Sequence, residues 1–431
     1  MTGKIAIDEL QVGMFVHLDL GWMQHPFPVG SFRITQAQQI DKIRRLGLKQ
    51  LRWCPEKSLL EPRAAAVLPL PADAADSEPG SGAAVAETAA QAAERGRREQ
   101  LAAQRASAQL CQRQFDEAGA AWAAAQASVL EQPQQARVQT EALARALLDK
   151  MLVDGDMCIR LIGANAGDAA GSHAMNVAVV SLLMGRVCGL SGEEMLDLGT
   201  GALMHDVGKL SLPAAVRAAD DAMSRDDLAA YRSHVAQGVL HGKRMGLAPG
   251  ALLVLAQHHE HADGSGFPMR VKADRMSTAA RIVALVNCYD NLCNPARMAC
   301  ALTPHEALSW LFAQAKTQFD AGLMNAFIRM MGVYPAGSVV QLTDDRYAIV
   351  MSVNSTRPLK PNVLVHDPAT PRDEALYLSL TGTPDLGIRR SLKPSQLPPD
   401  ARAYLAPRER VAYFFESAHA PLQADEEPAA A

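Results

Sequence analysis

Histidine and aspartate residues in the middle of this sequence have the types and spacing of a metal site. Asp206 directly follows His205, and Lys209 lies three residues after Asp206, so the three side chains can share one face of a helix. Neutral imidazole and carboxylate groups suit Mn, Fe, Ni or Zn at a hydrolytic centre, and helices that project such groups inward can build a dinuclear site. The same predicted helical region also contains His173, His234, His258 and His259. Taken alone, this pattern predicts metal-assisted hydrolysis of a phosphoester.

Simpler roles compete for some of these residues. His241, His261 and His305 lie outside the pattern, and we expect them to be structural because buried imidazoles usually find hydrogen bonds rather than metals. Lys209 could meet substrate charge. It could equally be a solvated lysine that the helix dipole favours near a helix C-terminus.

The loop DGSGFP follows the last histidine pair closely and has its own physical interpretation. Gly264 and Gly266 permit a positive φ or a close backbone approach, and Pro268 stiffens the exit, so this loop should border a substrate. Glu260 and Asp263 could orient histidines as hydrogen-bond acceptors, which metal-bound imidazoles commonly need. Asp263 could equally cap the turn of its own loop.

Two motifs together resemble a known family, the HD-GYP phosphodiesterases. His205 and Asp206 stand within LMHDVGK, and His258-His259-Glu260 leads into DGSGFP, with similar spacing from about His173 to Leu292. Near the N-terminus, VGMFVHLDL and WMQHPF are similar to a domain of uncharacterised role that often precedes HD-GYP domains. The resemblance implies a bacterial signalling hydrolase that opens cyclic di-GMP to the linear dinucleotide or GMP.

The resemblance also implies a set of site residues and two divalent transition-metal ions, Fe, Mn or similar. Asp206 would bridge the ions and act in catalysis with Lys209, which would neutralise a phosphate oxygen. One ion would be held by His173, His205, Asp206 and Asn287, and the other by Asp206, His234, His258 and His259. The expected substrate-binding residues are Lys209, Gly264, Gly266 and Phe267.

The sequence departs from the family pattern at several positions. Phe267 replaces a tyrosine, which keeps the ring and loses a hydroxyl donor. Ala169 stands where some members carry a glutamate for a third metal, which favours a dinuclear site. Asn287 replaces a metal-binding aspartate, so metal affinity should fall. Asp290, one turn later, is expected to have a structural role or to hydrogen-bond a metal ligand without binding metal itself. Arg297 is a doubtful phosphate ligand.

These departures keep two other functions open. A weakened metal site could bind the nucleotide or a protein partner without turnover, and Asn287 is the main support for such a sensor. An HD phosphohydrolase acting on another nucleotide is the third possibility, which the DGSGFP loop argues against. Protein partners could bind the N-terminal module or the long helix, and a homodimer is compatible with the sequence.

The sequence pattern around these residues predicts a mainly α protein. We expect an HD-type helical domain with a small N-terminal α/β module and a small C-terminal β appendage. The predicted segments are the module at 1–60, a linker and long exposed Ala/Gln/Glu/Arg-rich helix at 61–145, the phosphohydrolase domain at 146–330, a β-rich region at 331–418 and a disordered tail at 419–431.

Local patterns predict the individual elements. A helix is expected at Thr35–Leu46 after short strands in Ile5–Leu20, and the long helix at Ala86–Ala144. Ser191 with Glu194 forms a capping box before one helix of the central domain. Its helices are predicted at Ser172–Val187, Met195–His205, Leu228–Met245, Ala248–His259 and Ser277–Leu292, and the later strands at Val339–Leu342, Tyr347–Val353 and Val363–Val365.

Composition excludes several classes of protein. The formal net charge is −4 with a pI near 6.3, so no basic field favours a nucleic acid polymer. The seven cysteines are scattered without CxxC spacing, which indicates reduced thiols and a cytoplasmic protein. No apolar run approaches the roughly 20 residues of a membrane span.

Overall fold

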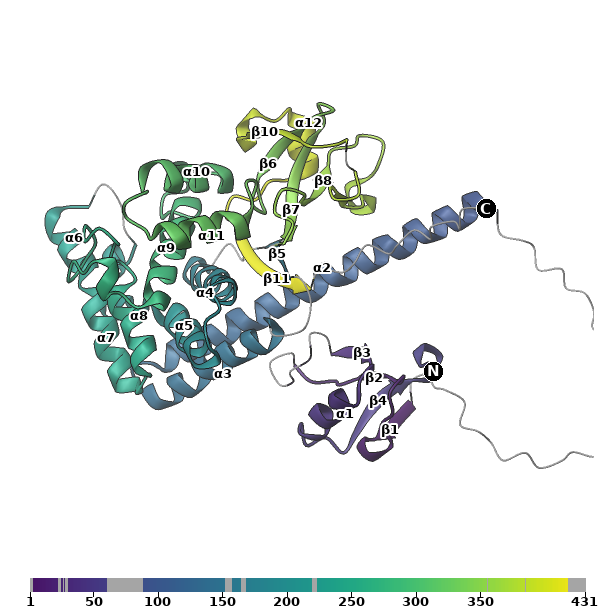
Figure 1. Cartoon of the computed structure of the whole chain (residues 1–431), viewed down its shortest axis with the longest axis horizontal. Coiled ribbons are helices and arrows are strands. Elements are labelled where there is room, and N and C mark those ends of the chain that lie inside the picture. The colour runs from purple at the N-terminus through teal and green to yellow at the C-terminus, as the bar shows by residue number, and fades with distance from the viewer. Residues whose placement is uncertain are drawn as a thin grey trace, which may run out of the picture. The chain divides into compact units, whose positions relative to one another are not determined.

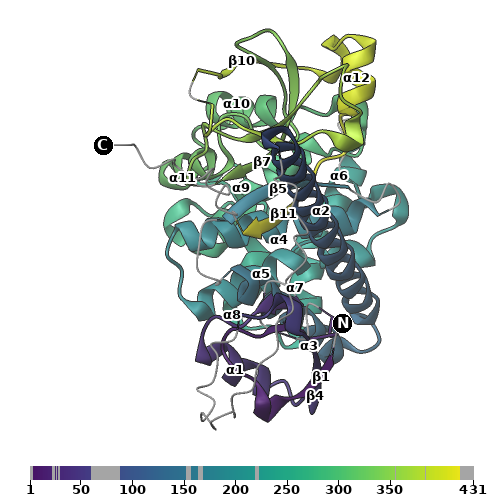
Figure 2. The same cartoon turned by 90° about the vertical axis from the view of Figure 1, so that its right-hand side faces the viewer.

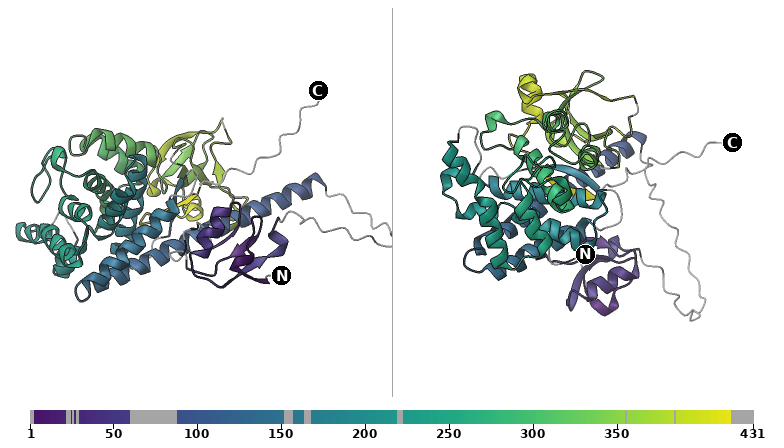
Figure 3. Two further views of the ribbon diagram at one scale, coloured as in Figure 1. Left: turned by 60° about the horizontal axis from the view of Figure 1, so that its bottom comes forward. Right: turned by 60° about the vertical axis from the view of Figure 1, so that its left-hand side comes forward.

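The computed structural model describes residues 3–21, 25, 27, 30–59, 88–151, 157–163, 168–218, 223–354, 356–383 and 385–417. The chain forms two compact units, Met1–Gln104 and Arg105–Ala431. Figures 1 to 3 show both units in several views, with the helices and strands labelled in Figures 1 and 2. The linker predicted before Ala86 and the tail predicted from His419 lie outside the described residues.

The first unit contains the expected α/β module. Its antiparallel sheet has the strand order β1-β4-β2-β3, formed by Gly3–Ala6, Gln50–Cys54, Phe15–His17 and Ser31–Arg33. Helix α1 (Ala37–Arg44) buries Ile40 and Ile43 in a core with Val16, Ile34 and Leu51. Alternation along these short strands places one apolar face on that core, which confirms the module.

The predicted long helix is two helices, α2 (Ala89–Ser128) and α3 (Pro133–Met151). Pro133 explains the break, since proline lacks an amide hydrogen and favours the first turn of a new helix. The expectation of an exposed helix is wrong for the later part of α2. Small and aromatic residues recur there at helical spacing and are buried: Cys111, Phe115, Ala118, Trp122 and Ala125.

Helices form most of the second unit, as expected. The helices that surround the histidines are α4 (Ala169–Val187), α5 (Gly192–Met204), α6 (Arg225–Arg232), α7 (His234–Met245), α8 (Pro249–Gln257) and α9 (Thr278–Cys293). The Ser191 hydroxyl accepts from the Glu194 amide, which confirms the capping box. The prediction of a single helix at Leu228–Met245 is wrong, because the helix is interrupted at Ser233 between α6 and α7. The Ser233 hydroxyl donates to the Ala230 carbonyl at this point.

A seven-stranded sheet completes this unit. Its main path is β10-β6-β7-β5-β11, and β8 pairs with β7 and β9. The expected strands β6 (Val339–Leu342), β7 (Tyr347–Asn354) and β8 (Asn362–Val365) are confirmed. The others are β5 (Met157–Ile162), β9 (Leu378–Ser379), β10 (Ile388–Leu392) and β11 (Ala412–Ser417), and further helices are α10 (Pro304–Gln314), α11 (Ala321–Met331) and α12 (Pro399–Leu405).

The pairing of β5 with β11 positions the site. These strands are antiparallel over their whole length, from Met157 opposite Ser417 to Ile162 opposite Ala412. All six residues of β5 are buried, so the period-2 alternation of a half-buried strand does not mark it in the sequence. The pair carries the end of the described chain back to the helices α4 and α9. No helix in the described part of the chain is long and apolar enough to cross a membrane.

Candidate active site

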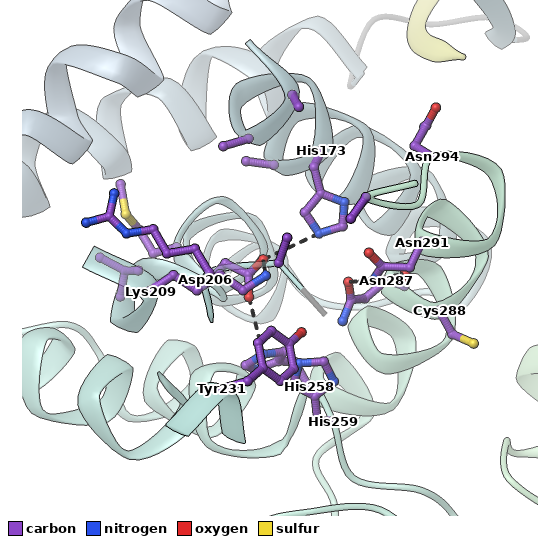
Figure 4. A pocket seen from close by; sticks show the side chains of 18 of the residues that line it. His173, Asp206, Lys209, Tyr231, His258, His259, Asn287, Cys288, Asn291 and Asn294 are labelled. Atoms are coloured by element: carbon purple, nitrogen blue, oxygen red, sulfur yellow. Dashed lines mark hydrogen bonds and ion pairs between the residues drawn. The ribbon is translucent and has the colours of Figure 1, made fainter. Parts of the chain in front are cut away.

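Five helices bring the predicted ligands to one place. His173 lies in the first turns of α4, His205 and Asp206 follow α5, His234 begins α7, and the pair His258 and His259 follows α8. Figure 4 shows several of these side chains around Asp206, with Asn287 of α9 to the right of Asp206 and below His173. Helix ends suit this purpose because side chains there can turn inward without disrupting helical hydrogen bonds.

Asp206 is the centre of the cluster. Its Oδ2 lies 3.6 Å from His173 Nε2 and 3.4 Å from His205 Nε2. Its Oδ1 lies 3.5 Å from His234 Nε2 and 3.9 Å from His258 Nε2. The two oxygens of one carboxylate therefore face two separate histidine groups, and two overlapping sets of ligand atoms result: His173, His205 and Asp206; and Asp206, His234, His258 and His259.

Backbone carbonyls fix the proton positions of three of these histidines. The Nδ1 atoms of His205, His234 and His258 lie 2.7, 2.5 and 2.9 Å from the carbonyl oxygens of Ala202, Tyr231 and Leu255. A carbonyl only accepts, so Nδ1 carries the proton and Nε2 keeps its lone pair. Each imidazole thus directs an unprotonated nitrogen toward Asp206.

The fourth imidazole is held by a carboxylate instead. His173 Nδ1 lies 2.6 Å from Asp290 Oδ2, and Asp290 also accepts from the side-chain amides of Asn176 (2.7 Å) and Asn294 (3.0 Å). This contact leaves His173 Nε2 as the free nitrogen. Asp290 is almost completely buried and fits the supporting position predicted for it.

This arrangement of lone pairs fits cations. His173 Nε2 is 3.1 Å from His205 Nε2, and His234 Nε2 is 3.2 Å from His258 Nε2. Two bare nitrogens at this separation repel each other, whereas nitrogens that share one ion at about 2.0–2.1 Å lie about 3 Å apart. Asp206 Oδ1 and His259 Nε2 are buried and have no hydrogen-bond partner among the described residues. The chain therefore contains histidine–aspartate clusters that could hold metal.

Electrostatics keep the same groups in the protonation states that metal ligands need. Burial would raise the pKa of the Asp206 carboxyl, yet the Lys209 ammonium beside it holds that pKa well below its ordinary value. Burial lowers the pKa of His234, and burial together with the neighbouring imidazoles lowers the pKa values of His258 and His259 well below theirs. Neutral pH thus gives an ionised Asp206 carboxylate and neutral His234, His258 and His259.

Lys209 lies beside the Asp206 carboxylate rather than free in the cavity. It belongs to a short 3₁₀ turn (Val207–Ser211), its Nζ lies 2.6 Å from Asp206 Oδ2, and the same Nζ lies 5.3 Å from the Tyr231 ring centroid. Burial lowers the pKa of this ammonium, but Asp206 more than offsets that effect and raises the pKa above its ordinary value. The simpler interpretation, a solvated lysine at a helix end, is wrong.

Asn287 lies beside the cluster, on the same face of α9 as Asp290. Its side chain is buried and lines the cavity. Its Oδ1 accepts from Asn291 Nδ2 at 2.8 Å, and the same amide also donates to the Asn287 carbonyl at 2.9 Å. The amide oxygen therefore already has one donor, and it brings no charge to an ion.

The residues of the DGSGFP loop separate into different roles. Phe267 lines the cavity and stacks on His259, with ring centroids 4.5 Å apart and an interplanar angle of 19°. Gly266 is buried, and a Cβ there would lie 2.4 Å from the His259 carbonyl oxygen, so the glycine allows a close backbone approach. Gly264 adopts φ +81° in its turn. Neither glycine is among the described residues that line the cavity, which differs from their expected contact with substrate.

The two acidic residues near this loop organise its backbone. Glu260 is buried, and its carboxylate accepts from the amides of Met269, Arg270 and Val271 at 2.6, 3.0 and 3.1 Å. Asp263 caps its own turn through the Ser265 amide at 2.9 Å and also accepts from Thr317. The expected histidine contact is thus replaced in Glu260 by loop amides, because three unpaired N–H groups converge on its carboxylate.

The cluster forms part of the wall of a large cavity. Its volume is about 700 Å³, within the range of sites for ligands of nucleotide size. Of the described residues that line it, Asp206 is the only carboxylate, whereas four are basic: Lys209, Arg217, Arg232 and Arg410. Trp122 and Tyr231 add aromatic surface. An anionic ligand with aromatic groups suits such a cavity.

Sequence reasoning missed several of these residues. Asn176 lies three residues after His173 and Asn294 four after Asp290, so helical spacing could have indicated both. Arg410 had no local signal, since long-range pairing of β11 brings it to the cavity. Outside the ligand sets, His241 bonds Ser211, His261 bonds Ser265 and His305 bonds the Val333 carbonyl, consistent with structural roles.

Two protein-family models match the chain. One is described as a domain of unknown function (DUF3391) and matches residues 2–146, and the other is an HD domain that matches residues 156–323. The cyclic di-GMP phosphodiesterase PA4108 of Pseudomonas aeruginosa is 25% identical over 378 residues, which cover 85% of each chain.

Two further relatives match the HD region. The cyclic di-GMP phosphodiesterase response regulator RpfG of Xanthomonas campestris pv. campestris is 30% identical, over 35% of this chain and 40% of the relative. The 3'3'-cGAMP-specific phosphodiesterase 2 of Vibrio cholerae is 28% identical, over 38% of this chain and 33% of the relative. The chain spans less than half the length of these two proteins. With both family matches in hand, we conclude that the chain carries an HD domain preceded by a domain of the DUF3391 family.

Proposed function

We propose that this chain is a metal-dependent phosphodiesterase that hydrolyses cyclic di-GMP to the linear dinucleotide or GMP in bacterial second-messenger signalling. The observation that carries the proposal is the pair of buried or half-buried ligand sets that share Asp206 in the wall of a cavity of about 700 Å³. The names of PA4108 and RpfG supply the substrate. A related protein specific for 3'3'-cGAMP makes that dinucleotide the first competitor to test.

We propose two divalent transition-metal ions, Fe, Mn or similar, as the cofactors. His173, His205, Asp206 and Asn287 would hold one ion, and Asp206, His234, His258 and His259 the other. When bound, such a pair lowers the pKa of a shared water and neutralises phosphodiester charge. Support comes from the four Nε2 lone pairs that face each other in two close pairs.

The chain's own residues would orient the phosphodiester and hold its charge. Lys209, now 2.6 Å from Asp206, can turn its ammonium toward a phosphate oxygen while it stays near the carboxylate. Asp290 keeps the His173 ring in one orientation, and Phe267 closes the wall behind His259. Both contacts reduce the freedom of ligand side chains before substrate arrives, which favours catalysis through preorganisation.

For the domain organisation we propose the boundaries that composition indicated. The catalytic domain would span 146–330, with the α/β module at 1–60, a linker and helical segment at 61–145, the β-rich region at 331–418 and a terminal tail at 419–431. The catalytic domain would share a sheet with the C-terminal region, since β5 pairs with both β7 and β11. The N-terminal module or the long helix would receive protein partners.

A nucleotide sensor without turnover is the second candidate. It is favoured by Asn287, whose neutral oxygen is already bonded to Asn291, because a weakly held ion would bind substrate charge without sustaining hydrolysis. Such a protein would bind cyclic di-GMP and release it unchanged.

Product analysis separates these functions. Purified, metal-analysed protein is incubated with cyclic di-GMP, with 3'3'-cGAMP and with bis(p-nitrophenyl) phosphate, and products are followed by chromatography. The proposal predicts linear dinucleotide or GMP from cyclic di-GMP. Tight binding without product would identify the sensor, and hydrolysis of the simple diester alone would show a phosphodiesterase with a different natural substrate.

A further inference from the structure

We propose that Arg410, a residue of the C-terminal segment, binds the second phosphate of the cyclic dinucleotide, the one that is not hydrolysed. The proposal rests on the proposed function and extends it to a residue that lies far outside the matched HD domain, which ends at residue 323. Arg410 is half-buried and lines the same cavity as the ligand sets.

The strand that follows Arg410 is hydrogen-bonded to α4, which contains His173, and to the C-terminal end of α9, which contains Asn287. Asn294 donates to the Val411 carbonyl at 2.9 Å and accepts from the Val411 amide at 2.9 Å. Asn176 donates to the same carbonyl at 3.0 Å and accepts from the Tyr413 amide at 2.9 Å. Four hydrogen bonds to two buried or half-buried side chains therefore fix the backbone beside Arg410.

These asparagines also hydrogen-bond Asp290, the carboxylate that orients His173. Asn176 and Asn294 both donate to Asp290 Oδ1, whose other oxygen accepts from His173. The position of Arg410 is thus coupled through one hydrogen-bonded network to the position of a proposed metal ligand. A cation held in this way is ordered before substrate binds, which lowers the entropy cost of binding.

The Arg410 guanidinium has N–H donors that its two carbonyl contacts do not use. Its contacts are long, 3.4 Å to the Asn294 carbonyl and 3.5 Å to the Pro295 carbonyl. Within the described part of the chain, no carboxylate pairs with it, whereas Lys209 is paired with Asp206. A guanidinium offers five N–H donors in a planar fork that matches two phosphate oxygens.

The location of Arg410 suits a ligand with two separated negative charges. Figure 4 shows Lys209 and Asn294 on opposite sides of the pocket, with Asp206 and His173 between them. Arg410 contacts the Asn294 carbonyl and therefore belongs to the Asn294 side. A cyclic dinucleotide carries its two phosphates on opposite sides of one ring. With one phosphate beside Asp206 and Lys209, the other needs a cation across the cavity, and Arg410 supplies it.

Binding to metal-stripped, full-length protein tests this role without depending on turnover. Calorimetry with cyclic di-GMP compares wild type, Arg410→Ala, Arg410→Lys and the control Arg402→Ala, which removes an exposed arginine outside the cavity. We expect Arg410→Ala to raise Kd by about 10- to 100-fold, the effect of one lost charge-assisted contact. Arg410→Lys should recover part of the loss because it restores the charge, and Arg402→Ala should bind like wild type.

Two further probes keep the outcomes distinct. Arg410→Ala should raise the Kd for cyclic di-AMP by the same factor as the Kd for cyclic di-GMP, because the two ligands have the same phosphates. A rise confined to cyclic di-GMP would show that Arg410 contacts guanine and would overturn the phosphate assignment. Metal-loaded Arg410→Ala should lose more of its activity on cyclic di-GMP than on bis(p-nitrophenyl) phosphate, which has only one phosphate. Wild-type affinity for cyclic di-GMP in a folded Arg410→Ala protein would overturn the proposal. Failure of metal-loaded wild type to bind or hydrolyse any cyclic dinucleotide would instead overturn the proposed substrate.

Discussion

The two ligand sets that share Asp206 differ in how firmly the chain holds them. His234 and His258 are fully buried side chains fixed by backbone carbonyls, and both point at Asp206 Oδ1. On the other side, the His173 side chain is 15% exposed and depends on Asp290, and Asn287 offers a neutral oxygen. The backbone carbonyl acceptors are held in place by their helices, whereas the Asp290 carboxylate can rotate about its own side-chain bonds. We therefore expect the His173 set to hold its ion more weakly.

The largest effect is expected at the residue common to both sets. Asp206→Ala should remove both ions and lower hydrolysis by more than about 10²-fold, because no other carboxylate among the described residues lines the cavity. Elemental analysis and product chromatography measure the two losses. Retention of one tightly bound ion would show that the two sets are independent and that Asp206 is no bridge.

Lys209 should matter for turnover and little for metal. We expect Lys209→Ala to keep its ions and lose about 10²-fold in hydrolysis, since an ammonium at the developing phosphate charge acts mainly in the transition state. Lys243→Ala, which removes an exposed lysine on α7, serves as the matched control. If Lys209→Ala lost metal as completely as Asp206→Ala, the lysine would support the ligand set instead of the substrate.

Asp290 allows the comparison between the two sets to be tested selectively. Asp290→Asn should weaken the ion at the His173 set by about 10- to 100-fold, because the His173 ring loses its charged acceptor. The ion at the His234 set should keep its affinity. Chelator titrations of this variant and of Asp274→Asn, an exposed control, provide the measurement. Equal weakening of both ions would contradict the asymmetry.

The smallest effect is expected at Asn287. Asn287→Asp should tighten the ion at the His173 set by about tenfold, because a charged oxygen binds a divalent ion more strongly and the two side chains have similar size. Asn291 can still donate to the new carboxylate. Melting temperature with and without added Mn reports the change through binding to the folded state. A variant less stable than wild type at saturating Mn, without a gain in affinity, would remove residue 287 from the site.

Local sequence patterns predicted the features that depend on residues close together in the sequence. The capping box at Ser191, the strands β6 and β7, and the approach of His173, His205, Asp206, His234, His258 and His259 all follow from spacing and family resemblance. Each of these features needs only a few adjacent residues, or a motif whose geometry a whole family shares. For this reason the mainly α fold and the ligand cluster could be predicted.

Long-range contacts account for what the sequence did not predict. All of β5 and residues 412–415 of β11 are buried, so these strands lack alternation. Their pairing joins residues about 250 positions apart. That pairing delivers Arg410 to the cavity and Val411 to Asn176 and Asn294. The sequence predicts a hydrogen bond from a histidine to Glu260, because it does not show that three loop amides converge on this carboxylate.

The number of ions in the wild-type protein tests the central claim most directly. Protein purified without chelators and reloaded with Mn or Fe is analysed for metal, and a chelator then removes the ions stepwise. The shared-aspartate site predicts about two ions per chain that leave in two steps, the weaker first. Fewer than one ion per chain after reloading would contradict a dinuclear centre at Asp206.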